Sequence, residues 1–152
     1  MKRLLITVSL LVLTPSSSHL YAQYAESELQ EIFKELLVFN GIENGWVDSD
    51  GDIQFTYNDH NYFIEINEED NEFFRLVLFN IWPIESVEER LDVLNAIDVV
   101  NRDRKVVKAY TTNDNVWIAA ELFISNPHDV NTIFLRCLEV IEGSIETFTS
   151  EM

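Results

Sequence analysis

Alternating apolar and polar side chains in residues 53–66 limit what this chain can fold into more than any other feature. The alternation runs through residues 53–57, stops at four polar residues, and resumes through residues 62–66. A period of two is typical of strands that bury one face and expose the other. We therefore expect an antiparallel β-hairpin, with Asp59-His60 as its two-residue loop.

The position of this loop decides which residues of the hairpin lie opposite one another. The predicted pairs are Tyr57–Tyr62, Phe55–Ile64 and Ile53–Ile66, all on one face. Phe63 falls on the opposite face, because successive side chains of a strand point to opposite sides.

Three other segments have apolar residues at helical spacing and are predicted to be helices with one buried face: residues 27–40, 86–101 and 126–147. Ser27, Ser86 and Asn126 stand where N-caps are expected. The buried stripe of the second helix is predicted to be Val87, Leu91, Leu94, Ile97 and Val100. The third contains Cys137, the only cysteine, which we expect to be a buried thiol outside any internal disulfide.

Three more strands complete the predicted sheet. Residues 73–79 form an apolar run that suits a strand buried on both faces. Residues 105–112 and 115–124 form a second hairpin around Asn113-Asp114, residues that tolerate positive φ angles. Its predicted pairs are Tyr110–Trp117, Lys108–Ala119 and Val107–Ala120. The order α-β-β-β-α-β-β-α predicts an α+β fold in which helices pack on one face of an antiparallel sheet.

The other face of such a sheet is left without a helix, and alternation places four large aromatic residues on it. They are Phe63, Tyr110, Trp117 and Phe123. Aromatic side chains gathered on an uncovered face usually mark a contact surface. We therefore predict that these four residues bind a partner, and the alternative is that a helix covers them.

The N-terminus has the layout of a secretory signal peptide. Lys2 and Arg3 precede an apolar run over residues 4–13, and a polar segment follows it. The run is too short to span a hydrocarbon core of about 30 Å. We predict cleavage after Ala22, a single domain over residues 23–152, and a periplasmic or secreted protein. The alternative is that residues 1–22 form a disordered segment or a buried helix.

The charge of the chain excludes some classes of partner. The formal net charge is −17, and removal of Lys2 and Arg3 with residues 1–22 makes it −19. A surface this negative repels phosphate backbones and anionic headgroups, so nucleic acids and membrane surfaces are disfavoured partners. Basic protein surfaces are favoured instead.

Four stretches give the chain a resemblance to a known family. They are Asp50-Gly51-Asp52-Ile53, residues 62–66, residues 100–108 and residues 115–118. The chain resembles the YbjN-like family of small bacterial proteins, labelled sensory transduction regulators, over nearly all of residues 23–152. The family's fold is similar to that of type III secretion chaperones, which are small, acidic, usually dimeric proteins that hold client segments. The resemblance thus implies a protein partner and a homodimer, and it supplies no active-site residues. The predicted signal peptide departs from it, because those chaperones work in the cytoplasm.

Asp48, Asp50 and Asp52 form the most site-like polar cluster in the sequence. Carboxylates two residues apart are suitable ligands for Ca²⁺. However, an EF-hand loop that began at Asp48 would need Gly at position 53 and Glu at position 59, where the chain has Ile53 and Asp59. We therefore favour a turn that leads into the hairpin, keep the calcium site as the weaker alternative, and expect neither a resident metal nor a cofactor.

The sequence contains no recognisable catalytic motif. His60 and His128 lack the spacing of metal ligands, and no G-x-S-x-G sequence occurs. We predict a non-enzymatic, chaperone-like or regulatory protein-binding module that associates with itself through the aromatic sheet face or a helix. The alternative is a small periplasmic hydrolase or ligand-binding enzyme whose site is assembled only in the fold.

Overall fold

The structure is a computed structural model that describes residues 24–152. The predicted signal peptide, residues 1–22, lies outside the described residues. The helices and strands are α1 Glu26–Phe39, β1 Trp46–Val47, β2 Ile53–Tyr57, β3 His60–Ile64, β4 Phe73–Pro83, α2 Val87–Asp103, β5 Val107–Thr112, β6 Asn115–Phe123, the 3-10 helix η1 Pro127–Thr132, and α3 Phe134–Glu151. No helix within the described residues is both long and apolar enough to cross a bilayer.

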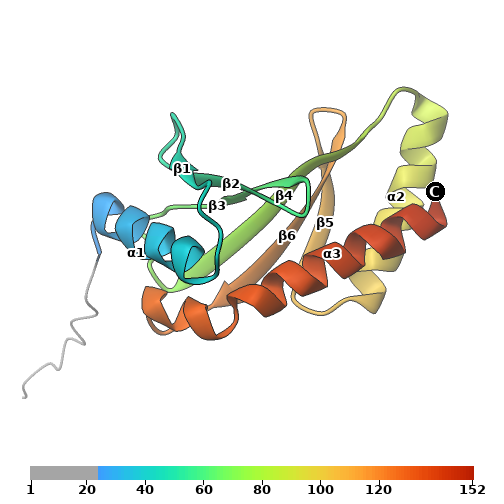
Figure 1. Ribbon diagram of the computed structural model, residues 1–152. Helices are drawn as coiled ribbons and strands as arrows, with labels where there is room; N and C mark the ends of the chain where they lie inside the picture. The colour runs from blue at the N-terminus through green and yellow to red at the C-terminus, as the bar shows by residue number, and fades with distance from the viewer. Residues whose placement is uncertain (1–23) are drawn as a thin grey trace, which may run out of the picture.

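The α+β class and the predicted order of the main elements are confirmed, with two additions. Strand β1 lies in a segment that we expected to be a loop. The helix predicted over residues 126–147 is divided into η1, which Asn126 caps, and α3, which extends to Glu151. The strands form one antiparallel sheet in the order β1-β2-β3-β4-β6-β5. Figure 1 shows α1 and α3 running across one face of this sheet, while α2 packs against α3 and β5.

The core lies between the helices and the inner face of the sheet. Its largest fully buried side chains include Phe55 and Tyr62, whose rings stack with centroids 5.3 Å apart. From α3, Phe134 packs against Phe55. Cys137 is buried in the same cluster, and burial raises the pKa of its thiol to about 11. The thiol is therefore a small apolar group, as predicted.

The second hairpin has the predicted register, but the first does not. All three predicted pairs of the second hairpin are present. In the first hairpin the loop is Asn58-Asp59, and Tyr57 pairs with His60. Both loop residues have positive φ, at 50° and 64°, which Asn and Asp adopt more easily than most residues. The pairing is shifted by two residues, and an even shift keeps every side chain on its predicted face.

Helix α1 begins one residue earlier than predicted and is capped differently. Ala25, not Ser27, is the N-cap, and the Glu28 carboxylate accepts the Ala25 N–H at 2.9 Å. Gly41 ends the helix with φ +77°, and Ile42 N–H donates to the Leu37 carbonyl in a Schellman arrangement.

Helix α2 has the predicted N-cap but a different buried face. Ser86 Oγ accepts the N–H of Glu89, as a capping box requires. The predicted stripe is wrong in its first half, because Val87, Leu91 and Leu94 are exposed. Ile97 and Val100 are buried as predicted, and Val93 and Ala96 are buried in place of the three exposed residues. The sequence holds two apolar stripes that overlap at Ile97 and Val100, and packing against α3 and β5 selects one of them.

An asparagine carboxamide caps one residue on each side of the sheet, in the terminal strand β5 and in the part of β2 that extends beyond the two-residue β1. Asn101 on α2 accepts the Ala109 N–H at 2.8 Å and donates to the Ala109 carbonyl at 3.1 Å. Asn44 does the same for Thr56 of β2, at 3.2 Å for both bonds. Each carboxamide takes the place of a neighbouring strand at one residue, and it blocks strand addition there.

Replacing Asn101 with Ala should lower the free energy of unfolding by about 1–2 kcal/mol, because two hydrogen bonds of Ala109 are lost. Asn101→Asp keeps the acceptor and loses the donor, so it should cost less. Urea denaturation of both variants measures the effect, with Asn95→Ala, an exposed asparagine on the same helix, as the matched control. Equal stability of Asn101→Ala and Asn95→Ala would contradict the capping role.

Candidate functional site

Four aromatic rings from four different strands meet on the outer face of the sheet. We define the aromatic cluster as Phe63, Phe79, Tyr110 and Trp117, from β3, β4, β5 and β6 respectively. Trp117 is its centre, with ring centroids 5.9 Å from Phe63, 5.8 Å from Phe79 and 6.1 Å from Tyr110. These rings pack on the fully buried Val77 and Ala119. Within residues 24–152, this outer cluster contains only residues of the sheet, so no described helix covers it.

An irregularity in β4 fixes the orientation of Trp117. The register between β4 and β6 shifts between Leu78 and Trp82, and Asn80 inside this bulge has φ +57°. The Asn80 carboxamide oxygen then accepts the Trp117 indole N–H at 3.0 Å. A bulge commonly re-aims a side chain at a functional face. Here it satisfies the polar atom of Trp117 while the ring stays partly exposed.

An ion-pair network borders the aromatic cluster. Arg75 donates to Glu65 at 2.6 Å and to the Tyr110 hydroxyl at 2.8 Å, and its Nε lies 3.1 Å from a Glu121 oxygen. Lys108 pairs with the same Glu121 at 2.9 Å. Burial is the largest single influence and acts to lower the pKa of Arg75, but the hydrogen bond to Glu65 and the charges of Tyr110, Glu65 and Glu121 together raise it overall. The two cations and two carboxylates balance, so the ion-pair network itself carries no net charge.

Three of the four predicted partner-binding residues lie together, and the fourth lies apart. Phe63, Tyr110 and Trp117 belong to the aromatic cluster. Phe123 is almost fully exposed, packs on Phe73 with ring centroids 5.8 Å apart, and is separated from Trp117 along β6 by Glu121. Phe79 was not predicted, because the apolar run 73–79 shows no alternation that would separate its two faces.

The acidic cluster at residues 48–52 is a hydrogen-bonded turn. One oxygen of the Asp48 carboxylate accepts the N–H groups of Asp50 and Asp52, and the other accepts the Gln54 side chain at 2.7 Å. Burial acts to raise the pKa of Asp48, but these hydrogen bonds lower it overall. Asp52 accepts the Ile66 N–H at 2.8 Å, and burial raises its pKa. The carboxylates of Asp48 and Asp52 thus bond to the protein itself.

The two histidines of the described region lie in different places. His60 Nδ1 is 3.2 Å from a Glu142 oxygen that also accepts the Tyr62 hydroxyl. Burial, and then the hydrogen bond to Glu142, raise the pKa of Tyr62, so its phenol stays protonated and holds Glu142 in place. His128 is exposed on η1, with its ring edge toward Tyr24. Among residues 24–152, no three His, Cys, Asp or Glu side chains are grouped so that they could hold a metal ion.

Two hollows lie on the helical side of the molecule. The larger holds about 440 Å³ between the first hairpin and α3, and it is lined by Tyr57, Asn58, Arg104, Leu135, Glu139, Glu142, Gly143 and Glu146. Arg104 in this cleft is held by Thr147 Oγ1 at 2.6 Å and the Gly143 carbonyl at 2.5 Å. Its guanidinium therefore serves to attach the segment after α2 to α3.

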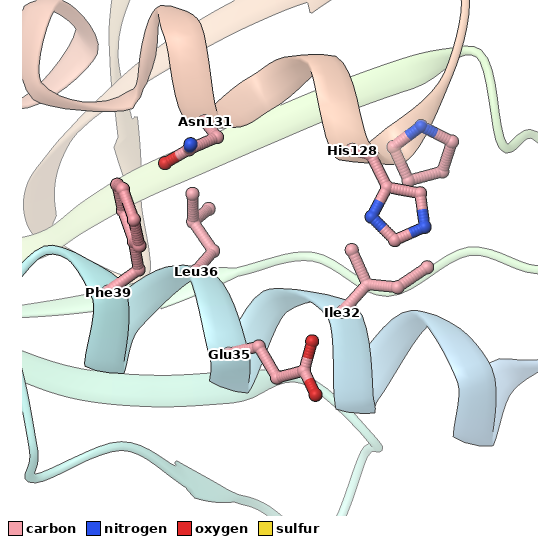
Figure 2. A pocket seen from close by; sticks show the side chains of 7 residues that line it. Ile32, Glu35, Leu36, Phe39, His128 and Asn131 are labelled. Atoms are coloured by element: carbon pink, nitrogen blue, oxygen red, sulfur yellow. The ribbon is translucent and has the colours of Figure 1, made fainter.

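The smaller hollow, which we name the α1–η1 groove, holds about 240 Å³. It is lined by Ile32, Glu35, Leu36, Phe39, Pro127, His128 and Asn131. Figure 2 shows Ile32, Leu36 and Phe39 extending from α1 toward the segment that carries His128 and Asn131. The groove thus combines apolar side chains with the polar Glu35, His128 and Asn131 in about equal measure.

Comparisons with solved structures place the fold. The crystal structure of YbjN from E. coli, described as "a putative transcription regulator", is similar with a TM-score of 0.59 and 11% identity, covering 80% of this chain and 90% of that one. The Yersinia pestis type III secretion chaperone SycH, crystallised with a fragment of YscM2, is similar with a TM-score of 0.51 and 14% identity, covering 78% and 98%. At these identities the likeness shows the fold alone.

Comparison of the sequence with curated proteins finds no significant match. A family model described as "Putative bacterial sensory transduction regulator" matches residues 30–122, which is more than half of the chain and includes most of α1, the whole of β1–β5 with α2, and most of β6. The predicted resemblance is therefore confirmed, and this chain belongs to the YbjN family.

Proposed function

We propose that this chain is an exported, non-enzymatic protein-binding module that acts as a regulator or chaperone and forms a homodimer. The observation that carries the proposal is the aromatic cluster, which no described helix covers. Phe63 is buried among its neighbours, whereas Phe79, Tyr110 and Trp117 are half-buried. A partner that covers the accessible part of these three rings would gain roughly 25 cal/mol per Å² of apolar surface. The membership in the YbjN family and a structural neighbour crystallised with a protein fragment support the same class of function.

The chemistry of the outer face suits a protein more than a small ion. Trp, Tyr and Phe are the residues most enriched at the centres of protein interfaces. The neighbouring ion-pair network is internally balanced, and it offers hydrogen-bonding groups at the margin of the apolar patch. An apolar centre with a polar rim is the usual anatomy of such interfaces.

Replacing Trp117 with Glu should leave the fold intact, because the Trp117 ring is only partly buried. It should also prevent partner binding, because the new carboxylate would lie in the contact surface. A central Trp contributes at least about 2 kcal/mol to binding, so affinity should fall roughly thirtyfold or more. Proteins captured from an envelope extract by wild type and variant are compared by mass spectrometry. Asn61→Glu, which adds the same charge at an exposed position of β3 on the same face, is the control.

Two outcomes would contradict this prediction. Unfolding of Trp117→Glu, seen by circular dichroism, would show that the ring belongs to the core and not to a contact surface. A folded variant that captures the same proteins as wild type would show that the aromatic cluster does not bind them.

The homodimer is assigned to α2, whose exposed side carries a second apolar stripe. Val87, Leu91 and Leu94 lie on one helical face with exposed fractions of 81%, 62% and 46%. The opposite face of the same helix is buried against α3 and β5. In a twofold dimer the same patch of each copy meets, so a self-complementary stripe of aliphatic residues is sufficient.

Leu91→Glu should convert the dimer into a monomer, because like charges would meet at the twofold axis. Light scattering should then give half the wild-type mass, while capture of the partner by the sheet face persists. Leu135→Glu, at a leucine of α3 that is 52% exposed, is the matched control and should keep the dimer mass. A monomeric wild type, or an unchanged mass for Leu91→Glu, would refute self-association through α2.

Export is compatible with how the described domain begins. Tyr24 is attached to the fold, since its N–H donates to Asn71 and its hydroxyl is hydrogen-bonded to Asn126 at 3.1 Å. All described helices and strands follow it in sequence. A cut after Ala22 would therefore remove none of these elements.

Mass spectrometry of the protein recovered from the periplasm or the medium should find an N-terminus at Gln23. Ala22→Arg should block cleavage and leave the precursor intact, because signal peptidase requires a small residue at that position. An intact Met1 on wild-type protein in the cytoplasmic fraction would refute export.

A further inference from the structure

The α1–η1 groove places a large aromatic residue in water. Phe39 is 76% exposed, whereas Leu36, one turn earlier and in the same groove, is buried. Figure 2 shows Ile32, Leu36 and Phe39 on the same side of α1, facing the segment with His128 and Asn131. Together they form an apolar floor with an exposed aromatic wall at one end.

The size of the groove indicates what fits in it. Small-molecule sites typically have volumes of about 300–1,000 Å³. The groove holds about 240 Å³, which suits one large side chain better than a cofactor. A single apolar anchor that fills a shallow groove is a common way in which a protein segment binds.

The charge around the groove indicates the charge of the protein segment that would bind there. Helix α1 carries four glutamates and one lysine, and Glu35 lines the groove itself. Asp129 follows His128 on the other wall, and the whole chain has a net charge of −17. Such a field attracts positive segments and repels negative ones.

We propose that the α1–η1 groove binds a basic segment of a partner protein, which inserts one large apolar side chain beside Leu36 and Phe39 and pairs a Lys or Arg with Glu35. This site rests on the proposed protein-binding function for its class of partner, but it is a surface distinct from the aromatic cluster. It gives the chain two binding sites, an aromatic face on the sheet and an acidic, partly apolar groove on the helical side.

The test is an NMR titration of the ¹⁵N-labelled full chain, and of the form that begins at Gln23, with the synthetic peptide Lys-Lys-Ala-Phe-Ala-Lys-Lys. Amide shifts should move in α1 and η1, with a Kd of roughly 0.1–1 mM for a single anchor. Peptides with Ser in place of Phe, or Glu in place of each Lys, should bind at least tenfold more weakly. Binding should also weaken with added salt.

Variants of the protein locate the site. Phe39→Glu should weaken binding at least tenfold. Val38→Glu, at the neighbouring residue that is 62% exposed and outside the groove, should leave it within twofold of wild type. Glu35→Gln should weaken binding several-fold and reduce its dependence on salt. Phe39→Ser replaces Phe39→Glu if the charged variant does not fold.

Several results would overturn the proposal. They are equal binding of the Phe and Ser peptides, equal effects of Phe39→Glu and Val38→Glu, or insensitivity to Glu35→Gln. Binding by the short form alone would show that the N-terminal segment of this chain occupies the groove instead. A lower mass of Phe39→Glu in light scattering would show that a second copy does.

The Trp117→Glu variant separates the two sites. It should bind the basic peptide as wild type does. If Trp117→Glu no longer binds the peptide while Phe39→Glu still does, the peptide binds at the sheet face and the proposed groove site is refuted. If the peptide binds at the groove but Trp117→Glu captures the same partners as wild type, the aromatic-face function is refuted and the groove remains.

Discussion

Strand β4 is the element on which the rest of the structure depends, because both hairpins are hydrogen-bonded to it. β3 pairs along one side and β6 along the other. Its inward residues, Phe74, Leu76 and Leu78, are fully buried against the helices, and outward Val77 is fully buried beneath the aromatic cluster. A polar substitution at Leu76 would bury an unsatisfied polar group on the inner face, and one at Val77 would do the same on the outer face. The core and the proposed binding face therefore share one strand, so a change in the position of β4 would affect the packing on both faces.

The accuracy of the sequence-based prediction depended on which residues were chosen as the loop of each hairpin. In the second hairpin the chosen loop, Asn113-Asp114, is the pair that has positive φ, and the predicted register was found. In the first hairpin the pair with positive φ is Asn58-Asp59, so the predicted loop was misplaced by one residue and the pairing by two. The faces were still correct, because side chains repeat with a period of two. In α2, two overlapping apolar stripes were available, and only tertiary contacts decide between them.

The candidate site was predictable as a face but not as a group of neighbours. Alternation placed Phe63, Tyr110 and Trp117 together correctly, yet it gave Phe123 the same status although Glu121 separates it from Trp117. The alternation of side chains along a strand shows which face of the sheet a residue lies on, but not how far it lies from another residue on that face. The bulge could have been predicted from Asn80, a polar residue inside an otherwise apolar stretch, because Asn tolerates positive φ better than most residues. The groove had no sequence signal, since it combines a helix with a segment almost 90 residues away along the chain.

The asparagine hydrogen bonds at the two sides of the sheet limit how this protein could bind a partner. Many domains bind extended peptides by adding a strand to an open edge, where main-chain hydrogen bonds supply the affinity. Here the carboxamides of Asn44 and Asn101 occupy the outward-facing groups of Thr56 and Ala109, one on each edge. A strand that paired there would first have to displace two hydrogen bonds. Strand addition is disfavoured at these two residues, so we expect side-chain surfaces to contribute most of the recognition, with affinity set by the apolar group that a partner presents and by its charge. The uncovered aromatic cluster and the acidic α1–η1 groove are surfaces of that kind, and their opposite chemical characters would let them bind different segments of one partner at the same time.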